Sequence, residues 1–179
     1  MSRKIFLLAV GGLLLCLLAG LVWRFKQKSE KDARVSQQIQ SIPSMTLTTL
    51  KGEKVEIEPF AWDRPFLLVY FNSKCDICKI TLNTLNTRIE EFDHVAILLA
   101  SNQLRDELES FSEGYPFLNQ ENVQLAIDEE MHLFTYLGVS SVPSIFLYDN
   151  SGNLIANYQG PVKLDILLNK LLNREEVKP

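Results

Sequence analysis

The chain has 179 residues, of which 46% are hydrophobic and 22% are charged, and its formal net charge is −4. This length allows one medium-sized domain with a short appendage. The slightly acidic balance excludes the strongly basic surface that nucleic-acid-binding proteins use.

The first long segment, residues 5–23, contains no charged residue and consists mostly of Leu, Ala, Val and Gly. As a helix it is about 28 Å long, close to the thickness of the hydrocarbon core of a bilayer. Arg3 and Lys4 precede it, so a cleaved secretory signal is the alternative. No small-x-small cleavage pattern follows, and we therefore predict an uncleaved transmembrane anchor after an N-terminal tail of residues 1–4.

The orientation of this anchor is open from the residues alone. Basic residues between Arg24 and Arg34 outnumber Arg3 and Lys4, which favours a cytoplasmic domain by the positive-inside rule. The four-residue tail is instead typical of an exported signal anchor. Residues 24–41 are polar and predict a tether with some helical character, and residues 42–179 form the predicted domain.

The domain opens with a predicted β-hairpin. Met45, Leu47 and Leu50 precede the turn Lys51-Gly52, and Val55 and Ile57 alternate with polar residues after it. We expect Phe60 and Trp62 to pack this hairpin onto the core.

The next strand leads to two cysteines. Residues 66–70 form a short apolar run typical of a buried strand, and Ile80, Leu82, Leu85 and Ile89 then follow a helical period. Cys75 therefore lies at a helix N-terminus, where free backbone N–H groups and the helix dipole stabilise a thiolate. This predicts that Cys75 is the nucleophile and that Cys78, one turn later, is the resolving cysteine.

The later segments alternate between strands and helices. The sequence predicts a buried strand over residues 95–100, a helix over 103–111, a short edge strand over 123–127, and a helix capped by Asp128 and ended by Gly138. A hairpin over 144–158 and a helix over 164–172 complete the chain. This order predicts an α/β fold, a mixed central sheet flanked by helices.

Two metal-binding alternatives compete with redox chemistry at the cysteine pair. A zinc site needs two further ligands, but Cys16 lies in the apolar segment and His94 and His132 have no compact ligand spacing. Soft thiolates also bind copper(I), which leaves a copper-binding module as an alternative. Two unreactive thiols are the third possibility. The strand-to-helix context favours the redox interpretation, which requires no metal and no organic cofactor.

The whole pattern resembles a thioredoxin-fold protein. The resemblance rests on the hairpin, the Cys-x-x-Cys helix, the segment 136–149 with Val142-Pro143, and the later Gly152 and Gly160. With the added N-terminal hairpin and the anchor, the chain is similar to the TlpA/ResA-like family of bacterial membrane-anchored thiol-disulfide oxidoreductases. The similarity covers roughly residues 42–172.

This resemblance implies a function. The Val142–Pro143 peptide bond would be cis, and both residues would contact an extended substrate segment. The chain would be a single-pass protein of the bacterial cytoplasmic membrane with an extracytoplasmic, periplasmic domain. It would reduce disulfides of exported proteins, for instance in cytochrome c maturation, and receive electrons from a membrane thiol-disulfide donor. A disulfide oxidase or isomerase is the alternative within the same class of enzyme.

The sequence also departs from the family pattern. The acidic residue buried in thioredoxin corresponds to Val69, the acid on the active-site helix of many reductases corresponds to Thr81, and the helix-kinking proline corresponds to Asn83. Around the dithiol, Lys74 and Lys79 favour the thiolate, whereas Asp76 disfavours it while complementing the helix N-terminus. We expect these three charges to tune the pKa values of the cysteines.

Overall fold

The computed structural model describes residues 3–61 and 63–175. The side chains of residues 3–11, 14, 15 and 172–175 are outside this described part, as are Trp62 and the start of the predicted tail. The chain divides into two compact units, Met1–Gln37 and Gln38–Pro179. The second unit begins at Gln38, four residues before the predicted boundary at residue 42. Ile39, which lies in this added stretch, is buried.

The first unit is one continuous helix, α1, at Arg3–Gln38, which extends one residue into the second unit. It covers both the predicted anchor and most of the predicted tether. Within the part of the chain that the structure describes, no helix meets the length and hydropathy that crossing a membrane requires.

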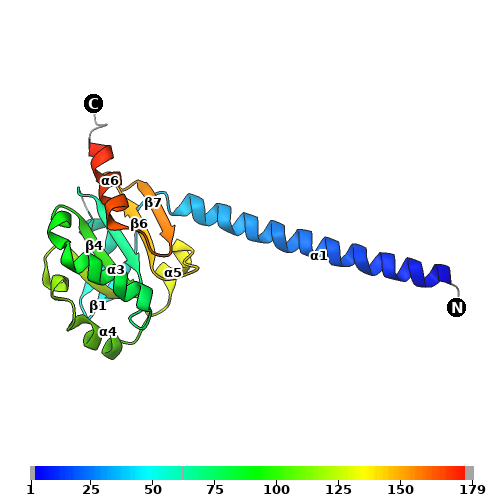
Figure 1. The fold of residues 1–179 in the computed structure, drawn as a ribbon, viewed down its shortest axis with the longest axis horizontal. Helices are drawn as coiled ribbons and strands as arrows, with labels where there is room; N and C mark the ends of the chain where they lie inside the picture. Colours follow the sequence, from blue (N-terminus) through cyan, green and yellow to red (C-terminus); the bar gives the residue numbers. More distant parts are fainter. Residues whose placement is uncertain (1–2, 62, 176–179) are drawn as a thin grey trace. The chain divides into compact units, whose positions relative to one another are not determined.

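Strands and helices alternate in the second unit (Figure 1). Its strands are β1 Thr46–Thr49, β2 Lys54–Glu56, β3 Phe66–Tyr70, β4 Ala96–Ser101, β5 Val123–Ile127, β6 Ser144–Tyr148 and β7 Leu154–Gln159. Its helices are α2 Ile57–Phe60, α3 Asp76–Thr87, η1 Ile89–Phe92, α4 Arg105–Ser112, η2 Pro116–Asn119, α5 His132–Leu137 and α6 Leu164–Glu175.

Among the described residues, seven strands form one sheet in the order β2-β1-β5-β4-β3-β6-β7. The pairs β3–β4 and β4–β5 are parallel, and the other neighbours are antiparallel. This mixed sheet confirms the predicted fold class and the added hairpin, which is β1–β2. The prediction that residues 123–127 form an edge strand is wrong, because β5 lies between β1 and β4.

The two central strands are buried along their whole length, which explains their uninterrupted apolar sequences. On one face, Leu67, Val69 and Phe71 belong to the main core together with residues of α3 and α6. On the other face, Tyr70 packs against Phe134 of α5, with ring centroids 5.4 Å apart. Burying each such leucine contributes about 1.5–3 kcal/mol to stability.

The buried stripe of α3 differs from the predicted one. Cys78, Thr81, Leu82 and Leu85 face the core, whereas Ile80 is 65% exposed. Positions separated by three or four residues share one face of a helix, and the face fixed by Leu82 and Leu85 includes position 81 and excludes position 80. Packing therefore selects the face by register, even though isoleucine is more hydrophobic than threonine.

Helix α5 begins at His132 with Met131 as its N-cap residue, so the prediction that Asp128 occupies the cap position is wrong, although its carboxylate still bonds the first turn of the helix. The buried Asp128 carboxylate accepts hydrogen bonds from the N–H groups of Leu133 (3.2 Å) and Phe134 (2.8 Å). It also accepts a hydrogen bond from the hydroxyl of Tyr70 at 3.0 Å. Gly138 ends the helix with a φ of 61°, as predicted, because glycine adopts this left-handed conformation at low cost.

Candidate active site

A short turn joins β3 to α3 and presents Cys75. The side-chain oxygen of Asn72 accepts a hydrogen bond from the N–H of Lys74 at 2.8 Å, and its carbonyl oxygen accepts one from the N–H of Cys75 at 3.1 Å. An asparagine that bonds the backbone two residues later forms a tight local turn. The strand therefore ends with Cys75 fixed immediately before the first residue of the helix.

Cys75 is the N-cap residue of α3. Its Sγ atom accepts a hydrogen bond from the backbone N–H of Cys78 at 3.3 Å. The Sγ atom therefore lies at the end of the helix where backbone N–H groups are free to donate. Cys75 is partly exposed and Cys78 is only 1% exposed, and both are free thiols. Of these two thiols, only Cys75 is therefore accessible to a large partner.

The segment around Pro143 lies against the first cysteine. The Val142–Pro143 bond is cis, the isomer expected from the family resemblance. The Sγ atom of Cys75 lies 3.8 Å from the carbonyl oxygen of Val142, within the reach of a weak S–H donor. The carbonyl oxygen of Pro143 accepts a hydrogen bond from the N–H of Gly160 at 2.8 Å. The fold thus brings the loop after β7 beside this segment.

The three charged residues predicted to tune the site lie around it, in ion pairs. The Nζ atom of Lys74 is 2.5 Å from Oε1 of Glu107, and the Nζ atom of Lys79 is 3.5 Å from Oδ1 of Asp76. Glu107 is a residue that sequence reasoning missed. It belongs to α4, and its spacing in the chain carries no sign that it approaches the cysteines.

The positions where related proteins carry an acid hold no acid here. Val69 is buried in the core, and the hydroxyl of Thr81 donates a hydrogen bond to the carbonyl oxygen of Ile77 at 3.0 Å. Burial raises the pKa of the Cys78 thiol to about 12. A hydrogen bond from the backbone of Asn72 opposes this rise, and the neighbouring Cys75 thiol adds to it. Cys78 is therefore protonated at neutral pH.

We expect the two thiols to differ in reactivity toward iodoacetamide. At pH 8, Cys75 should be modified, whereas Cys78 should stay unmodified because it is both buried and protonated. Peptide mass mapping of the reduced protein distinguishes these residues from Cys16. Equal labelling of both thiols in the folded protein at pH 8 would contradict this assignment.

Since the pKa of Cys78 is raised on folding, the folded reduced protein should also lose stability as the pH rises from about 9 toward 12.

We searched the described residues for groups of side chains that could hold a metal ion. Within the described residues, no group of three or more His, Cys, Asp or Glu side chains is arranged to hold a metal ion. His132 is exposed and its Nε2 atom lies 3.3 Å from Oε2 of Glu130.

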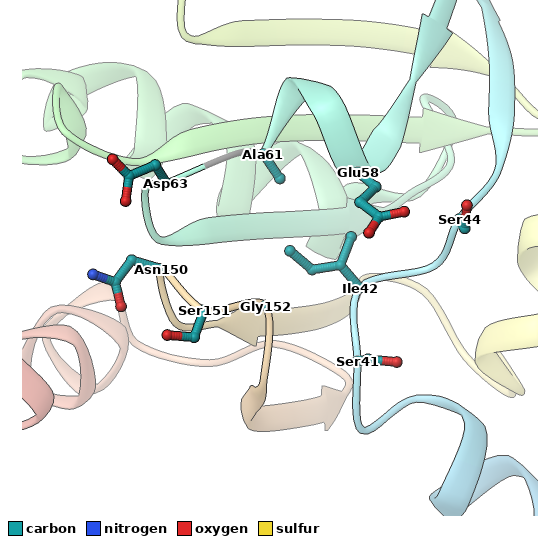
Figure 2. A pocket seen from close by; sticks show the side chains of 9 residues that line it. All are labelled: Ser41, Ile42, Ser44, Glu58, Ala61, Asp63, Asn150, Ser151 and Gly152. Carbon is teal, nitrogen blue, oxygen red and sulfur yellow. The ribbon is translucent and has the colours of Figure 1, made fainter.

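A separate pocket lies between the loop after α1, helix α2 and the β6–β7 turn. Figure 2 shows the side chains of Glu58, Asp63 and Asn150 around it. The residues that line this pocket include none of the predicted site residues. The candidate active site is therefore the surface around Cys75 and Pro143, where the first cysteine, the N-terminus of α3 and the carbonyl oxygen of Val142 lie together.

Several solved structures are similar to the chain. DsbF of Mycobacterium tuberculosis is 18% identical, with a TM-score of 0.63, over 76% of this chain and 96% of its own. A secreted M. tuberculosis disulfide oxidoreductase, homologous to E. coli DsbE, is 17% identical, with a TM-score of 0.62, over 76% and 98%. StoA from Bacillus subtilis is 18% identical, with a TM-score of 0.57, over 72% and 98%. At 17–18% identity these similarities show a shared fold.

The fold and the paired thiols define a thioredoxin-like oxidoreductase, which confirms the class expected from the sequence. Residues 39–157 match the AhpC/TSA family. The chain belongs to this family. No curated protein sequence matches it significantly.

Proposed function

We propose that the protein is a membrane-tethered thiol-disulfide oxidoreductase that reduces disulfides of exported proteins through Cys75 and Cys78. The observation that carries this proposal is the asymmetry of the pair. Cys75 is partly exposed, and its sulfur accepts a hydrogen bond from a backbone N–H in the first turn of α3 and lies near the carbonyl oxygen of Val142. Cys78 is buried one turn later. Nucleophile and resolving thiol are distinguished by their positions.

The reaction proceeds in two exchanges. The Cys75 thiolate attacks one sulfur of the substrate disulfide, which forms a mixed disulfide and releases the other substrate sulfur as a thiolate. Cys78 then gives its proton to the substrate thiolate released in the first step and attacks the Cys75 sulfur, which forms the Cys75–Cys78 disulfide and releases the second substrate sulfur as a thiolate. Two electrons pass to the substrate, and a donor dithiol in the membrane later returns two electrons to the protein.

The substrate approaches along the Val142–Pro143 segment in this proposal. The carbonyl oxygen of Val142 faces the nucleophilic sulfur, so a substrate strand pairing with this backbone brings its own disulfide to Cys75. Disulfides of exported proteins, such as the cysteines that receive haem in cytochrome c maturation, are the proposed substrates, because disulfides persist in oxidising compartments.

The direction of electron flow is tested by a redox titration of the full-length chain against glutathione and dithiothreitol, following Cys75 and Cys78 by alkylation and mass. A reductase should show a reversible Cys75–Cys78 disulfide with a potential near or below about −250 mV. A potential above about −180 mV identifies an oxidase or isomerase instead. Failure to form this disulfide contradicts the catalytic proposal, and bound copper(I) in the purified protein supports the binding module.

The proposal of a membrane anchor is supported by residues 5–23, which contain no charged residue. We expect the chain to remain in the membrane pellet after alkaline carbonate extraction. We also expect protease added outside the cytoplasmic membrane to digest the domain. Release of the chain by carbonate contradicts the anchor, and protection from the protease contradicts the extracytoplasmic orientation.

A further inference from the structure

A buried glutamine, Gln103, bonds the turn that precedes Cys75. β3 and β4 are parallel, with Tyr70 paired to Ala100. Ser73 and Gln103 lie three residues after this pair, beyond the ends of the two strands, and therefore meet at the same edge of the sheet. The side-chain oxygen of Gln103 accepts a hydrogen bond from the backbone N–H of Ser73 at 2.6 Å. A backbone N–H can only donate, and this contact therefore fixes the orientation of the amide.

The remaining polar atoms of this amide are also bonded. Its nitrogen donates to Oγ of Ser73 and to Oε2 of Glu107, both at 2.8 Å, and its oxygen accepts a weaker bond from Oγ of Ser101 at 3.3 Å. The side chain uses both donors and both lone pairs while only 8% exposed. A fully satisfied buried amide holds one geometry, so Gln103 ties the turn to the first turn of α4.

Glu107 uses its second oxygen for Lys74. Oε1 lies 2.5 Å from the Nζ atom of Lys74, the residue immediately before the nucleophile. The hydrogen bonds from Lys74 and Gln103 lower the pKa of the Glu107 carboxyl, which is therefore ionised at neutral pH. The ammonium expected to favour the Cys75 thiolate is thus bound by a carboxylate that the fold brings from another helix.

We propose that Gln103, Glu107 and Lys74 form a tuning triad that fixes the turn before Cys75 and neutralises the Lys74 charge. In this arrangement Gln103 and Glu107 are positioning residues. They give the Cys75–Cys78 pair a lower reduction potential than it would have beside an unpaired Lys74. The proposal rests on the proposed thiol-disulfide function and assigns residues that set its potential. The contacts of the triad with the turn span 30 and 33 positions of the sequence. The parallel register of β3 and β4 brings these residues together.

Charge variants of the full-length chain test the triad, with the equilibrium constant against glutathione as the readout. Glu107→Gln leaves Lys74 uncompensated, which stabilises the thiolate of the reduced form, and should shift the constant about threefold toward the dithiol. Lys74→Met leaves Glu107 uncompensated and should shift it about threefold the other way. The double variant should return close to the wild-type value, and high salt should reduce both shifts.

Two further variants complete the experiment. Glu91→Gln removes the same charge from a pair with Arg88 at the far end of α3, so it should leave the constant unchanged. Gln103→Met releases Glu107 and should shift the constant in the same direction as Glu107→Gln. An unchanged constant in Gln103→Met overturns the role of Gln103. The triad is overturned if Glu107→Gln and Lys74→Met shift the constant in the same direction or leave it unchanged. It is also overturned if Glu91→Gln shifts the constant as much as Glu107→Gln does.

A second readout separates this inference from the proposed function. The rate of Cys75 alkylation at fixed pH requires no disulfide. It should rise in Glu107→Gln and fall in Lys74→Met. If the wild-type chain forms no Cys75–Cys78 disulfide but these rates move in opposite directions, the proposed function fails, while the neutralisation of the Lys74 charge by Glu107 stands. If the disulfide forms and the rates do not move, the triad fails and the function stands.

Discussion

Cys78→Ser should trap the protein in a covalent complex with its substrate. Cys75 remains able to attack a disulfide, but no thiol is left one turn later to release the mixed disulfide. With insulin as a disulfide-bearing test protein, a complex should accumulate on a non-reducing gel and disappear when dithiothreitol is added. Cys75→Ser should form no complex, and its turnover should fall by roughly 10³-fold or more, as expected for the loss of a nucleophile.

Cys16→Ser is the matched control for these two variants. It replaces the same residue type at an exposed position of α1, outside the compact unit that holds the dithiol. Turnover and complex formation should equal those of the wild-type chain. A complex that forms equally in Cys75→Ser and Cys78→Ser would contradict the assignment of Cys75 as nucleophile.

Asp128→Ala should destabilise the domain by about 3–5 kcal/mol, a large fraction of the stability of a typical domain. The carboxylate is only 2% exposed, so its loss leaves the N–H groups of Leu133 and Phe134 and the hydroxyl of Tyr70 without this acceptor in the interior. Burial, and next the charge of Asp128, raise the pKa of the Tyr70 phenol, which therefore remains a donor. Urea unfolding of the full-length chain measures the change.

Asp149→Ala is the control that separates burial from simple hydrogen-bond loss. Asp149 also accepts backbone hydrogen bonds, from the N–H groups of Ser151 (3.0 Å) and Asn153 (2.8 Å), but in a solvent-exposed turn. Water can replace this acceptor, so the cost should be only about 1 kcal/mol. Equal costs for the two variants would show that Asp128 does not act as a buried acceptor.

The sequence predicted those parts of the protein that are encoded by neighbouring residues. Uninterrupted apolar runs identified the central strands, and Lys51-Gly52 identified the first hairpin. The change from a strand pattern to a helical period located Cys75 at a helix N-terminus, where the structure places it. Strand, turn and helix-terminus signals act over a few residues, and local sequence therefore carries them.

Tertiary structure decided what depends on pairing between distant segments. It placed β5 inside the sheet, and it buried Thr81 in place of Ile80. It also brought Gln103 and Glu107 to the turn at Ser73 and Lys74, across separations of 30 and 33 residues. Strand order and helix register are fixed by the packing of the whole core, and no local pattern of residues specifies which side chains then meet at the edge of the sheet.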